Sequence, residues 1–535
     1  MSILSRVGLS VSYPLPHRSG AGGRDPASIR ALPSNVVPAT IPESNRVLCL
    51  TDRLLFNYQR CSRRAFLELH GDLTQRDPPS DYLRKLKQDS VEHSHSILLN
   101  YQPLHQPIYP PQDWMAGASA TWALMQQGVE HIKRGVLTRQ DANGMLLVST
   151  PTLLVKQPGE SVLGDWCYVP IDIKLGKKPK LDYQVISTFH AYVLAEVQGV
   201  WPDTSWLALR AGKLYAVDLE RQFPRMQEIL QICIQDLQQQ DLPEVFIAHS
   251  RCDLCQWFSY CYSQAQAEQH LSLLPGVTPA RYAHLQALNL TTVAALSVAN
   301  PEQLAPLPGF GELVAEKLVH QAQAALQNRA IARTSPHPSQ PFPLLPADLP
   351  SADIELYFDI EAAPDKNLIY LHGVLVVDYQ AETETFHSLV AEEPDQEQAA
   401  WEQFLSLVLN YPNAPIYHFC PYEAQTVQRL AEEYGAPSGQ IEPLLERFVD
   451  VHKRVTDAVT LPIESYALKH IARWLGFDWR DLGANGAQSI CWYDEWLVTG
   501  DRAYLDAILR YNEDDCRATY WIKNWLVEFA QPFWE

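Results

Sequence analysis

Two pairs of side chains near the C-terminal end have the types and spacing of a divalent-metal site. Asp359 and Glu361 alternate with apolar residues in a run that has the pattern of a buried strand. Side chains in a strand point alternately to its two faces, so both acids share one face and repel each other unless a cation joins them. Tyr511 and Asp515 lie one turn apart in a helical pattern and share a helix face. We therefore predict that Asp359, Glu361 and Asp515 bind a divalent cation, in preference to a solvated strand face and helix surface.

A middle acid completes this pattern. Glu423 follows Tyr422, and we take it as a further metal ligand, with Asp450 as its rival. With these motifs, residues 353–535 resemble the DEDDy branch of RNase H-like 3′–5′ exonucleases, which carry Asp-x-Glu, a middle Asp and Tyr-x-x-x-Asp; here Glu replaces the middle Asp. The resemblance implies Mg²⁺ or Mn²⁺ ions held by the carboxylates, which activate water and stabilise the leaving 3′ oxygen, with Tyr511 orienting the water.

Three cysteines lie within ten residues, in the pattern Cys252-x2-Cys255-x5-Cys261. Thiols this close are redox-labile in a reducing compartment unless they hold a metal or a cluster. A sulfur site needs a fourth ligand, and Cys61 is the candidate. This layout resembles the RecB/Cas4-type nuclease domains, which implies a [4Fe-4S] cluster that joins the two ends of a PD-(D/E)xK fold. Four thiolates also suit Zn²⁺, which stays the alternative.

An Asp-x-Lys motif lies between the distant cysteine and the other three. Asp172 and Lys174 end an apolar run that has the pattern of a strand, and His93 lies upstream. In the RecB/Cas4-type fold such an acid binds metal, such a lysine polarises the phosphate or water, and an upstream histidine matches His93. The resemblance therefore implies a second nuclease centre at Asp172, Lys174 and His93.

This second centre departs from the family pattern in two places. Thr152 stands where the family has an acidic metal ligand, and Ser187–His190 stands near the position of the family's Gln-x-x-x-Tyr motif. Hydroxyl groups bind Mg²⁺ weakly, so we predict that the centre is degenerate and that its domain is kept for DNA binding. Glu160 or Asp165, which are near in sequence, could supply the missing acid.

Two glycine-containing turns interrupt a stretch of short amphipathic helices. The sequence Leu-Pro-Gly-Phe-Gly at 307–311 resembles the hairpin of a helix-hairpin-helix motif, whose glycines let backbone N–H groups approach a phosphate. The sequence Leu-Pro-Gly-Val at 274–277 resembles a second copy without the second glycine. The resemblance implies binding of a duplex backbone at Gly276, Gly309 and Gly311, and an ordinary glycine helix cap is the alternative.

Several domains are needed to position these groups, because 535 residues exceed the size of one efficient core. Apolar runs at 145–155 and 166–173 predict strands among helices, and runs at 354–360 and 368–377 predict strands of a second α/β unit that also has helices at 397–409 and 505–527. Six prolines in residues 334–350 predict a linker. The expected organisation is a disordered lead (1–45), a PD-(D/E)xK-like domain (46–265), a helix-hairpin-helix module (271–328), a proline-rich linker (329–352) and an RNase H-like domain (353–535).

Composition narrows the class of protein. The chain is 46% hydrophobic and 19% charged, and it contains no apolar run long enough to span a membrane. Its net charge of −20 argues against a protein that coats nucleic acid nonspecifically, but it is compatible with a nuclease whose acids hold metal. Most of the ten cysteines are scattered, as in a reduced cytoplasmic protein.

Together, the order of modules from about residue 46 to 535 resembles the RecB-like putative nuclease family that has a C-terminal RNase H-like exonuclease domain and occurs chiefly in bacteria. The resemblance implies an α/β multidomain DNA-processing nuclease, in repair or defence, whose working exonuclease is C-terminal. Two alternatives stay open. One is a noncatalytic nucleic-acid-binding scaffold, and the other is an RNA-processing exonuclease, because RNase H-like sites cleave either polymer.

Overall fold

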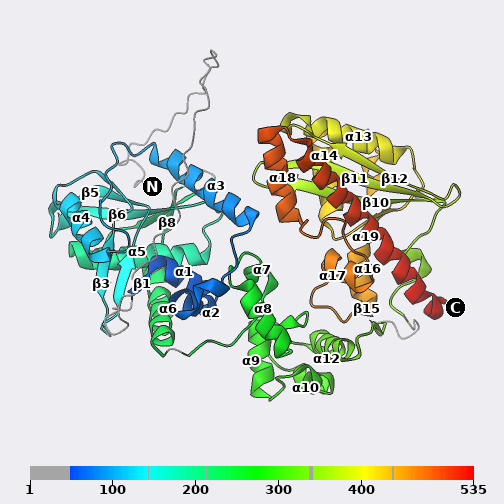
Figure 1. Cartoon of the computed structure of the whole chain (residues 1–535), viewed down its shortest axis with the longest axis horizontal. Helices are drawn as coiled ribbons and strands as arrows, with labels where there is room; N and C mark the ends of the chain where they lie inside the picture. The colour runs from blue at the N-terminus through cyan, green and yellow to red at the C-terminus, as the bar shows by residue number, and fades with distance from the viewer. Residues whose placement is uncertain are drawn as a thin grey trace, which may run out of the picture. The chain divides into compact units, whose positions relative to one another are not determined.

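The computed structural model describes residues 49–535, apart from 143, 211, 213, 240, 336–341, 437 and 438. The expected lead at 1–45 and part of the expected linker lie outside the described residues. All elements below belong to the unit that spans Leu48–Glu535 (Figure 1). None of the described helices is long and apolar enough to cross a lipid bilayer.

The N-terminal region contains two sheets. A mixed five-stranded sheet has the order β2-β5-β6-β7-β8, and a three-stranded sheet has the order β1-β4-β3. The strands are β1 (Cys49–Thr51), β2 (His131–Lys133), β3 (Leu137–Gln140), β4 (Leu146–Ser149), β5 (Leu153–Ser161), β6 (Gly164–Lys174), β7 (Ser205–Leu209) and β8 (Leu214–Val217). The helices are α1 (Asp52–Arg60), α2 (Ser62–His70), α3 (Asp81–Leu98), α4 (Trp114–Gln126), α5 (Leu181–Gln198) and α6 (Leu219–Gln239).

Helix α5 lies at the centre of this region. It contacts strands of both sheets, and Val185, Phe189 and Leu194 are fully buried in one core with residues of β4, β5 and α6. The run at 145–155, expected as strand, is divided between β4 and β5, which belong to different sheets. Pro151 lies at the break, where its missing N–H removes a ladder hydrogen bond.

A helical segment follows, with a small core of its own. Leu285, Leu296 and Leu318 are at most 1% exposed in a cluster that joins the short helices. The helices are α7 (His249–Cys252), α8 (Phe258–Ala267), α9 (Pro279–Ala287), α10 (Val293–Ser297), α11 (Pro301–Leu304) and α12 (Glu312–Gln327), with the 3₁₀ turn η3 (Leu271–Leu273). The short strand β9 (Ile331–Ala332) then pairs with β15 (Val459–Thr460).

The C-terminal region is built around a five-stranded sheet of order β12-β11-β10-β13-β14, in which β10 is central. β10 is antiparallel to β11 and parallel to β13. The strands are β10 (Ile354–Ala363), β11 (Leu368–Asp378), β12 (Thr383–Val390), β13 (Ile416–His418) and β14 (Phe448–Asp450). The helices are α13 (Glu397–Leu409), α14 (Tyr422–Tyr434), α15 (Ile441–Leu445), α16 (Val451–Ala458), α17 (Leu468–Trp474), α18 (Gly486–Thr499) and α19 (Arg502–Trp534).

Helices cover both faces of this sheet. Phe358 and Ile360 of β10 pack in a core with α13 and α14, whereas Tyr357 lies in a separate core with α16, α17 and α19. Figure 1 shows α19 crossing the sheet beside β10. Since side chains alternate along β10, Asp359 and Glu361 face the α19 side. The strands and α13 were predicted closely, but α19 is longer than the expected 505–527, because Asp501 caps its start by accepting a hydrogen bond from Ala503.

The described end of the proline-rich segment is part of this C-terminal core. It forms no strand or α-helix, as its prolines predict, and contains only the 3₁₀ turn η4 (Pro346–Asp348). Phe342 and Leu344 are each 2% exposed, and the Phe342 ring stacks on Phe533 with centroids 4.6 Å apart. Residues 342–349 therefore act as a packed strap along α19 rather than as a free linker.

Candidate functional site

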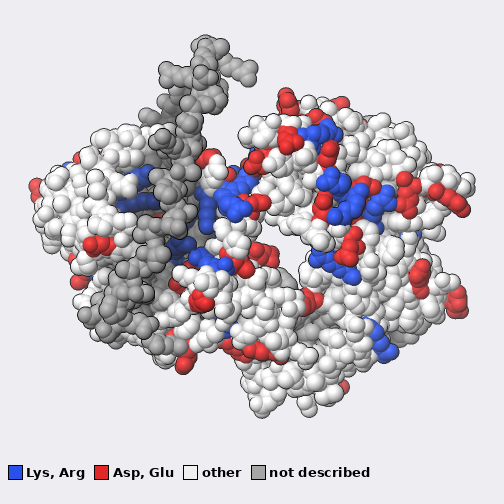
Figure 2. Space-filling view, viewed as in Figure 1, with Lys and Arg blue, Asp and Glu red and all other residues white. Residues whose placement is uncertain are grey.

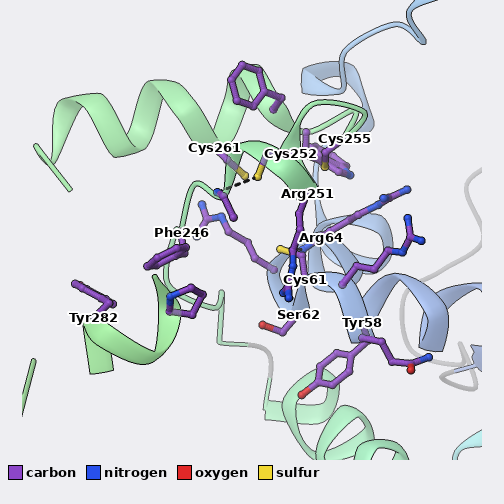
Figure 3. Close-up of a pocket in the computed structure, with 17 residues that line it drawn as sticks. Tyr58, Cys61, Ser62, Arg64, Phe246, Arg251, Cys252, Cys255, Cys261 and Tyr282 are labelled. Atoms are coloured by element: carbon purple, nitrogen blue, oxygen red, sulfur yellow. Dashed lines mark hydrogen bonds between the residues drawn. The ribbon is translucent and has the colours of Figure 1, made fainter. Parts of the chain in front are cut away.

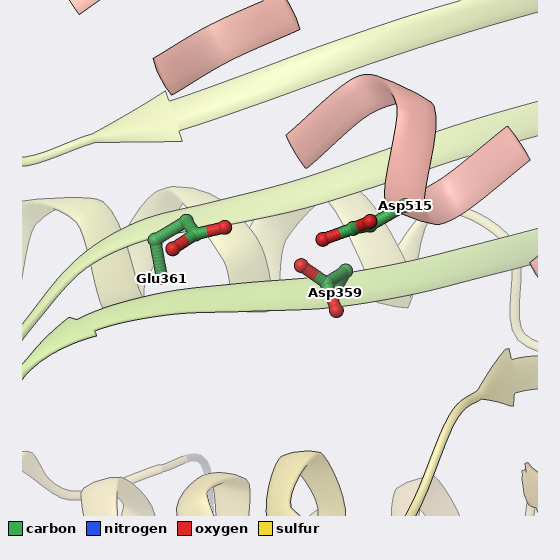
Figure 4. A group of neighbouring side chains, drawn as sticks. All are labelled: Asp359, Glu361 and Asp515. Carbon is green, nitrogen blue, oxygen red and sulfur yellow. The ribbon is translucent and has the colours of Figure 1, made fainter. Parts of the chain in front are cut away.

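Three carboxylates meet between β10 and α19. Asp359 and Glu361 come from the central strand and Asp515 from the helix, and one ligand oxygen from each lies within 4.8 Å of the others. Figure 4 shows the three carboxylate groups pointing toward one another. Glu361 and Asp515 are buried, and Asp359 is partly buried. The structure thus brings together the acids that the strand and helix periodicities had paired separately.

Neutral donors orient these carboxylates. The Asn512 amide donates a hydrogen bond to Asp359 over 2.7 Å, and the Trp479 indole N–H donates to Asp515 over 2.7 Å. The Asn512 side chain fits only because its neighbour on β11 is Gly373, where a Cβ would lie 1.6 Å from the Asn512 oxygen. No local sequence pattern had pointed to Asn512, Trp479 or Gly373.

The pKa values of the carboxylates show that nearby positive charge does not offset their burial and mutual repulsion. Burial, followed by the charges of Asp515, Glu361 and Glu423, raises the pKa of Asp359 well above its usual range. Burial and the charge of Asp515 raise the pKa of Glu361 to about 8, and burial raises that of Asp515 to about 7 despite the Trp479 hydrogen bond. Three clustered carboxylates cannot all ionise easily unless a cation neutralises them. Their oxygen ligands fit a hard divalent cation such as Mg²⁺ or Mn²⁺.

Glu423 is the better placed of the two candidate middle acids. It lies in the first turn of α14, is 5% exposed, and its charge raises the pKa of Asp359. Its carboxylate lies 3.3 Å from His418 Nδ1, which also lies 2.6 Å from the Cys420 carbonyl oxygen. Asp450 instead caps α16 by accepting a hydrogen bond from the Lys453 amide. Asp450 therefore has a structural role that Glu423 does not.

Tyr511 lies beside the carboxylates together with a cation that the sequence analysis missed. The Tyr511 hydroxyl is hydrogen-bonded to Asp515, as expected from their spacing on one helix face. Lys469 Nζ lies 4.8 Å from the centre of the Tyr511 ring and 5.1 Å from that of Trp479. The Lys469 ammonium lowers the pKa of Asp515, although it does not offset the effect of burial.

The comparison with known families agrees with this geometry. Residues 356–527 match the RNase H superfamily model. The matched span contains the whole carboxylate cluster and Tyr511, so this RNase H-like domain has the character of a metal-dependent nuclease that acts on nucleic acid with Mg²⁺ or Mn²⁺. No curated protein matches the chain at a significant level of sequence similarity.

Outside the RNase H-like domain, Asp172 and Lys174 lie on one face of β6, at the centre of the N-terminal five-stranded sheet. Lys174 Nζ lies 2.6 Å from one Asp172 oxygen, and the Thr152 hydroxyl donates to the other over 2.8 Å. Although burial opposes it, the charges of Lys174 and His190 hold the pKa of Asp172 below its usual range. The charge of Asp172 is thus balanced by the Lys174 ammonium, and Thr152 occupies the position expected for an acid.

Another acid lies near this centre, although it is not one that the sequence analysis considered. His190 Nε2 lies 3.6 Å from Asp172 and 3.9 Å from Asp52, at the start of α1, while His190 Nδ1 lies 2.7 Å from the Ser149 hydroxyl. The suggestion that Glu160 or Asp165 compensates for Thr152 is wrong. Both are exposed and flank the β5–β6 turn, where Ser161 pairs with Gly164. Ile171, the neighbour of Asp172, pairs with Leu153 at the other end of β5.

His93 lies close to the same centre. It is on α3, and it is hydrogen-bonded to the backbone of Lys174. Burial, and then the charge of Arg210, lowers the pKa of His93. The structure therefore places His93 near Asp172 and Lys174.

The four predicted cysteine ligands line one cavity of about 320 Å³. Figure 3 shows Cys61, Cys252, Cys255 and Cys261 around it, with Arg64 and Arg251 among the other lining residues. Cys61 separates α1 from α2, while the other three lie in and around α7 and α8. Burial raises the pKa of Cys252 to about 11 and also raises those of Cys255 and Cys261. A cavity walled by four partly buried thiols fits a metal or cluster, which would stabilise the thiolate forms.

The two glycine turns lie close together. Gly276, Gly309 and Gly311 all have positive φ, of 90°, 81° and 71°, which explains why each is glycine. The Arg281 guanidinium donates to the Gly276 carbonyl over 2.7 Å and to the Gly309 carbonyl over 2.8 Å, so one side chain joins both turns. A Cβ at Gly309 or Gly311 would contact nothing within 4 Å, so the second turn is open to its surroundings.

Proposed function

We propose that this chain is a 3′–5′ exonuclease that acts on DNA through the RNase H-like domain. The observation that carries the proposal is the group of Asp359, Glu361 and Asp515, with Tyr511 hydrogen-bonded to the last of these. Asp359, Glu361, Glu423 and Asp515 would hold the divalent ions. When bound, such ions supply a reactive hydroxide at neutral pH and neutralise charge on the leaving oxygen.

The residues of the chain have distinct roles in this proposal. The Asn512 amide fixes the orientation of Asp359, and the Trp479 N–H fixes that of Asp515. The Tyr511 hydroxyl, already within hydrogen-bonding reach of Asp515, orients the attacking water. The apolar core of Phe358 and Ile360 behind β10 prevents the strand from shifting under the repulsion of its acids.

The direct experiment is a cleavage assay on 5′-labelled single-stranded DNA, duplex DNA and RNA with Mg²⁺ or Mn²⁺. A ladder of progressively shortened labelled DNA is the expected product. A released label without a ladder would overturn the 3′–5′ direction, and faster loss of RNA would favour an RNA-processing exonuclease. Absence of cleavage on every polymer, with binding retained, would leave the noncatalytic scaffold.

We further propose that the N-terminal domain, residues 46–265, is a RecB/Cas4-like fold whose nuclease centre is degenerate and which binds nucleic acid. Two observations support degeneracy. Thr152 donates its hydroxyl to Asp172 where an acidic ligand would stand, and Lys174 neutralises the same acid. Asp52 and His190 are the groups that could restore metal binding. Metal-dependent cleavage that survives loss of the C-terminal carboxylates would contradict degeneracy.

The cavity walled by Cys61, Cys252, Cys255 and Cys261 is proposed to hold a [4Fe-4S] cluster, with Zn²⁺ as the alternative. Anaerobically purified protein should be brown, and metal analysis should find about four irons per chain. Stoichiometric zinc without iron would favour the alternative. Cys255→Ser should destabilise the N-terminal domain, because ligation closes the loop from Cys61 to Cys261. None of the ten cysteines, all of which are among the described residues, forms a disulfide bond, which supports a reducing, cytoplasmic setting.

The segment at 271–328 is proposed to bind a duplex backbone as a pair of helix-hairpin-helix turns. Two observations support this. Gly309 and Gly311 have positive φ and leave free space around their turn, and the Arg281 side chain donates hydrogen bonds to the carbonyls of both Gly309 and Gly276. Gly311→Val should weaken duplex binding in a gel-shift assay, because a branched side chain disfavours φ of 71° and covers the amides. Unchanged duplex affinity in this variant would indicate an ordinary helix cap.

A further inference from the structure

The turn between β6 and α5 concentrates positive charge in an acidic protein. Residues 174–180 read Lys-Leu-Gly-Lys-Lys-Pro-Lys, whereas the whole chain has 42 Lys and Arg against 62 Asp and Glu. Lys177, Lys178 and Lys180 are exposed. The two acids that flank the turn already have partners: Asp172 is paired with Lys174 and Asp182 with Arg60. The three exposed ammonium groups are therefore available to an external anion.

A fourth cation adjoins this turn. Arg210 follows β7, and its backbone amide donates to the Gly176 carbonyl over 3.3 Å, which holds the arginine beside the lysines. Its positive charge contributes to lowering the pKa of His93, after the larger effect of burial. Figure 2 shows basic side chains gathered on this face of the molecule, over the region of β6, β8 and α3. Arg210 therefore adds a fourth positive charge beside the turn.

The turn is held in shape before any ligand binds. The Gln184 amide donates to the Pro179 carbonyl over 2.8 Å, and the Lys180 amide donates to the Lys178 carbonyl over 2.9 Å. Gly176 lies flat against Tyr183, since a Cβ there would come within 2.9 Å of that ring. Fixing the backbone of a binding loop in advance lowers the entropy lost on association.

We propose that Lys177, Lys178, Lys180 and Arg210, here called the lysine turn, bind the phosphodiester backbone of a nucleic-acid strand. The inference rests on the proposed function, in which nucleic acid is the substrate, and it names the surface by which the degenerate domain holds it. Lysine ammonium groups act as point charges and read no base edges, so binding is without sequence preference and is driven by counterion release.

The test measures binding by the full chain, in an Asp359→Asn background that prevents trimming. The probes are a fluorescein-labelled single-stranded oligonucleotide and the corresponding duplex, and the readout is anisotropy at several salt concentrations. Lys177→Ala/Lys178→Ala should raise the Kd by about tenfold and flatten the slope of log K against log [salt] by about 1.4 for the single strand, or about 1.8 for the duplex. The probe whose Kd rises more identifies the strand form that this surface holds.

Two matched variants separate charge from shape and from general electrostatics. Lys177→Arg/Lys178→Arg keeps both charges and should bind like the parent. Arg221→Ala/Arg225→Ala removes two exposed charges from α6 of the same domain and should leave the slope unchanged. Equal weakening by the alanine and arginine variants of the lysine turn, or by the α6 control, would overturn the proposal. If the parent binds neither probe, the proposed function itself fails.

A second readout separates binding at the lysine turn from chemistry at the carboxylates. In the otherwise wild-type chain, Lys177→Ala/Lys178→Ala should raise the KM for oligonucleotide trimming about tenfold, in line with its effect on Kd. Hydrolysis of the 4-nitrophenyl ester of thymidine 5′-monophosphate should not change, because this small ester reaches only the RNase H-like site. An equal loss with both substrates would mean that the substitutions disturb the catalytic domain, and would contradict the inference.

Discussion

Asp172 and Asp359 both lie on the third strand of a five-stranded sheet, yet their surroundings push their ionisation in opposite directions. Asp172 has Lys174 at 2.6 Å, and that charge keeps its pKa low. Asp359 has Glu361 and Asp515 as neighbours, and burial together with their charges raises its pKa. At the N-terminal centre a lysine of the chain balances the charge of Asp172, whereas at the C-terminal centre the clustered carboxylates have no such balance without a bound cation. A metal-dependent activity is therefore expected at the C-terminal centre and not at the N-terminal centre.

The largest expected effect comes from removing a carboxylate from the C-terminal centre. Asp359→Asn should lower 3′ trimming by about 10³-fold, the equivalent of roughly 4 kcal/mol of lost metal-assisted stabilisation, while the domain stays folded. Lys174→Ala should change total nuclease activity little. Residual endonuclease activity in Asp359→Asn that disappears when Lys174→Ala is added would show that the N-terminal centre works.

A smaller loss is expected when the orientation of Asp359 is disturbed without removing it. Gly373→Ala places a Cβ where the Asn512 side chain lies, so it should displace the amide and lower activity about 10- to 100-fold. Asn512→Ala should lose activity to a similar extent. The double variant should recover thermal stability, because the clash is gone, but not activity. Full activity in Gly373→Ala would show that this contact does not position Asp359.

Substitutions in the N-terminal centre should change the stability of the domain rather than nuclease activity. Lys174→Met leaves the Asp172 charge without its cation and should lower the free energy of unfolding of the N-terminal domain by about 2 kcal/mol. This is less than for a fully buried pair, because Lys174 keeps 25% of its side chain exposed. Asp172→Asn/Lys174→Met should recover much of the loss in urea titrations. A double variant less stable than Lys174→Met would mean that the pair does not act as a unit.

A further effect concerns pH. In metal-free protein the pKa values of Glu361 and Asp515, about 8 and about 7, lie above those of unfolded carboxyls, so the folded state binds more protons. Stability from these groups is complete at low pH and is lost as pH rises through 7 to 8. The midpoint of thermal unfolding of the RNase H-like domain should therefore fall between about pH 6 and about pH 9 in EDTA. Added Mg²⁺ should raise this midpoint more at the higher pH, and an equal rise at both would contradict the assignment.

The sequence was sufficient to predict candidate site residues where these residues lie at regular spacing within one strand or one helix. Asp359 with Glu361 on a strand, and Tyr511 with Asp515 on a helix, are each visible from local spacing, and the tertiary structure joins the two pairs. The strands around them were predicted because both faces of the sheet are covered and the runs are therefore apolar.

The residues that support these sites depend on contacts between distant parts of the chain, which leave no local pattern. Asn512 adjoins Tyr511 on α19, but it can approach Asp359 only because Gly373 of β11 leaves room for it, and Lys469 reaches Tyr511 from α17. At the N-terminal centre, Asp52 and His190 approach Asp172 from α1 and α5 through packing that no spacing rule encodes. Nearness in sequence suggested Glu160 and Asp165, which the hairpin carries to the far end of its strands.

Helix α1 makes the cysteine cavity and the N-terminal centre mechanically dependent on each other. Asp52 is its first residue and Cys61 directly follows its last, and a helix of nine residues is a stiff rod about 14 Å long. A displacement of the whole helix at its Cys61 end would therefore also displace Asp52 at the other end. Because His190 lies between Asp52 and Asp172, the position of a cysteine in the cavity and the geometry of the N-terminal centre are linked through this one helix.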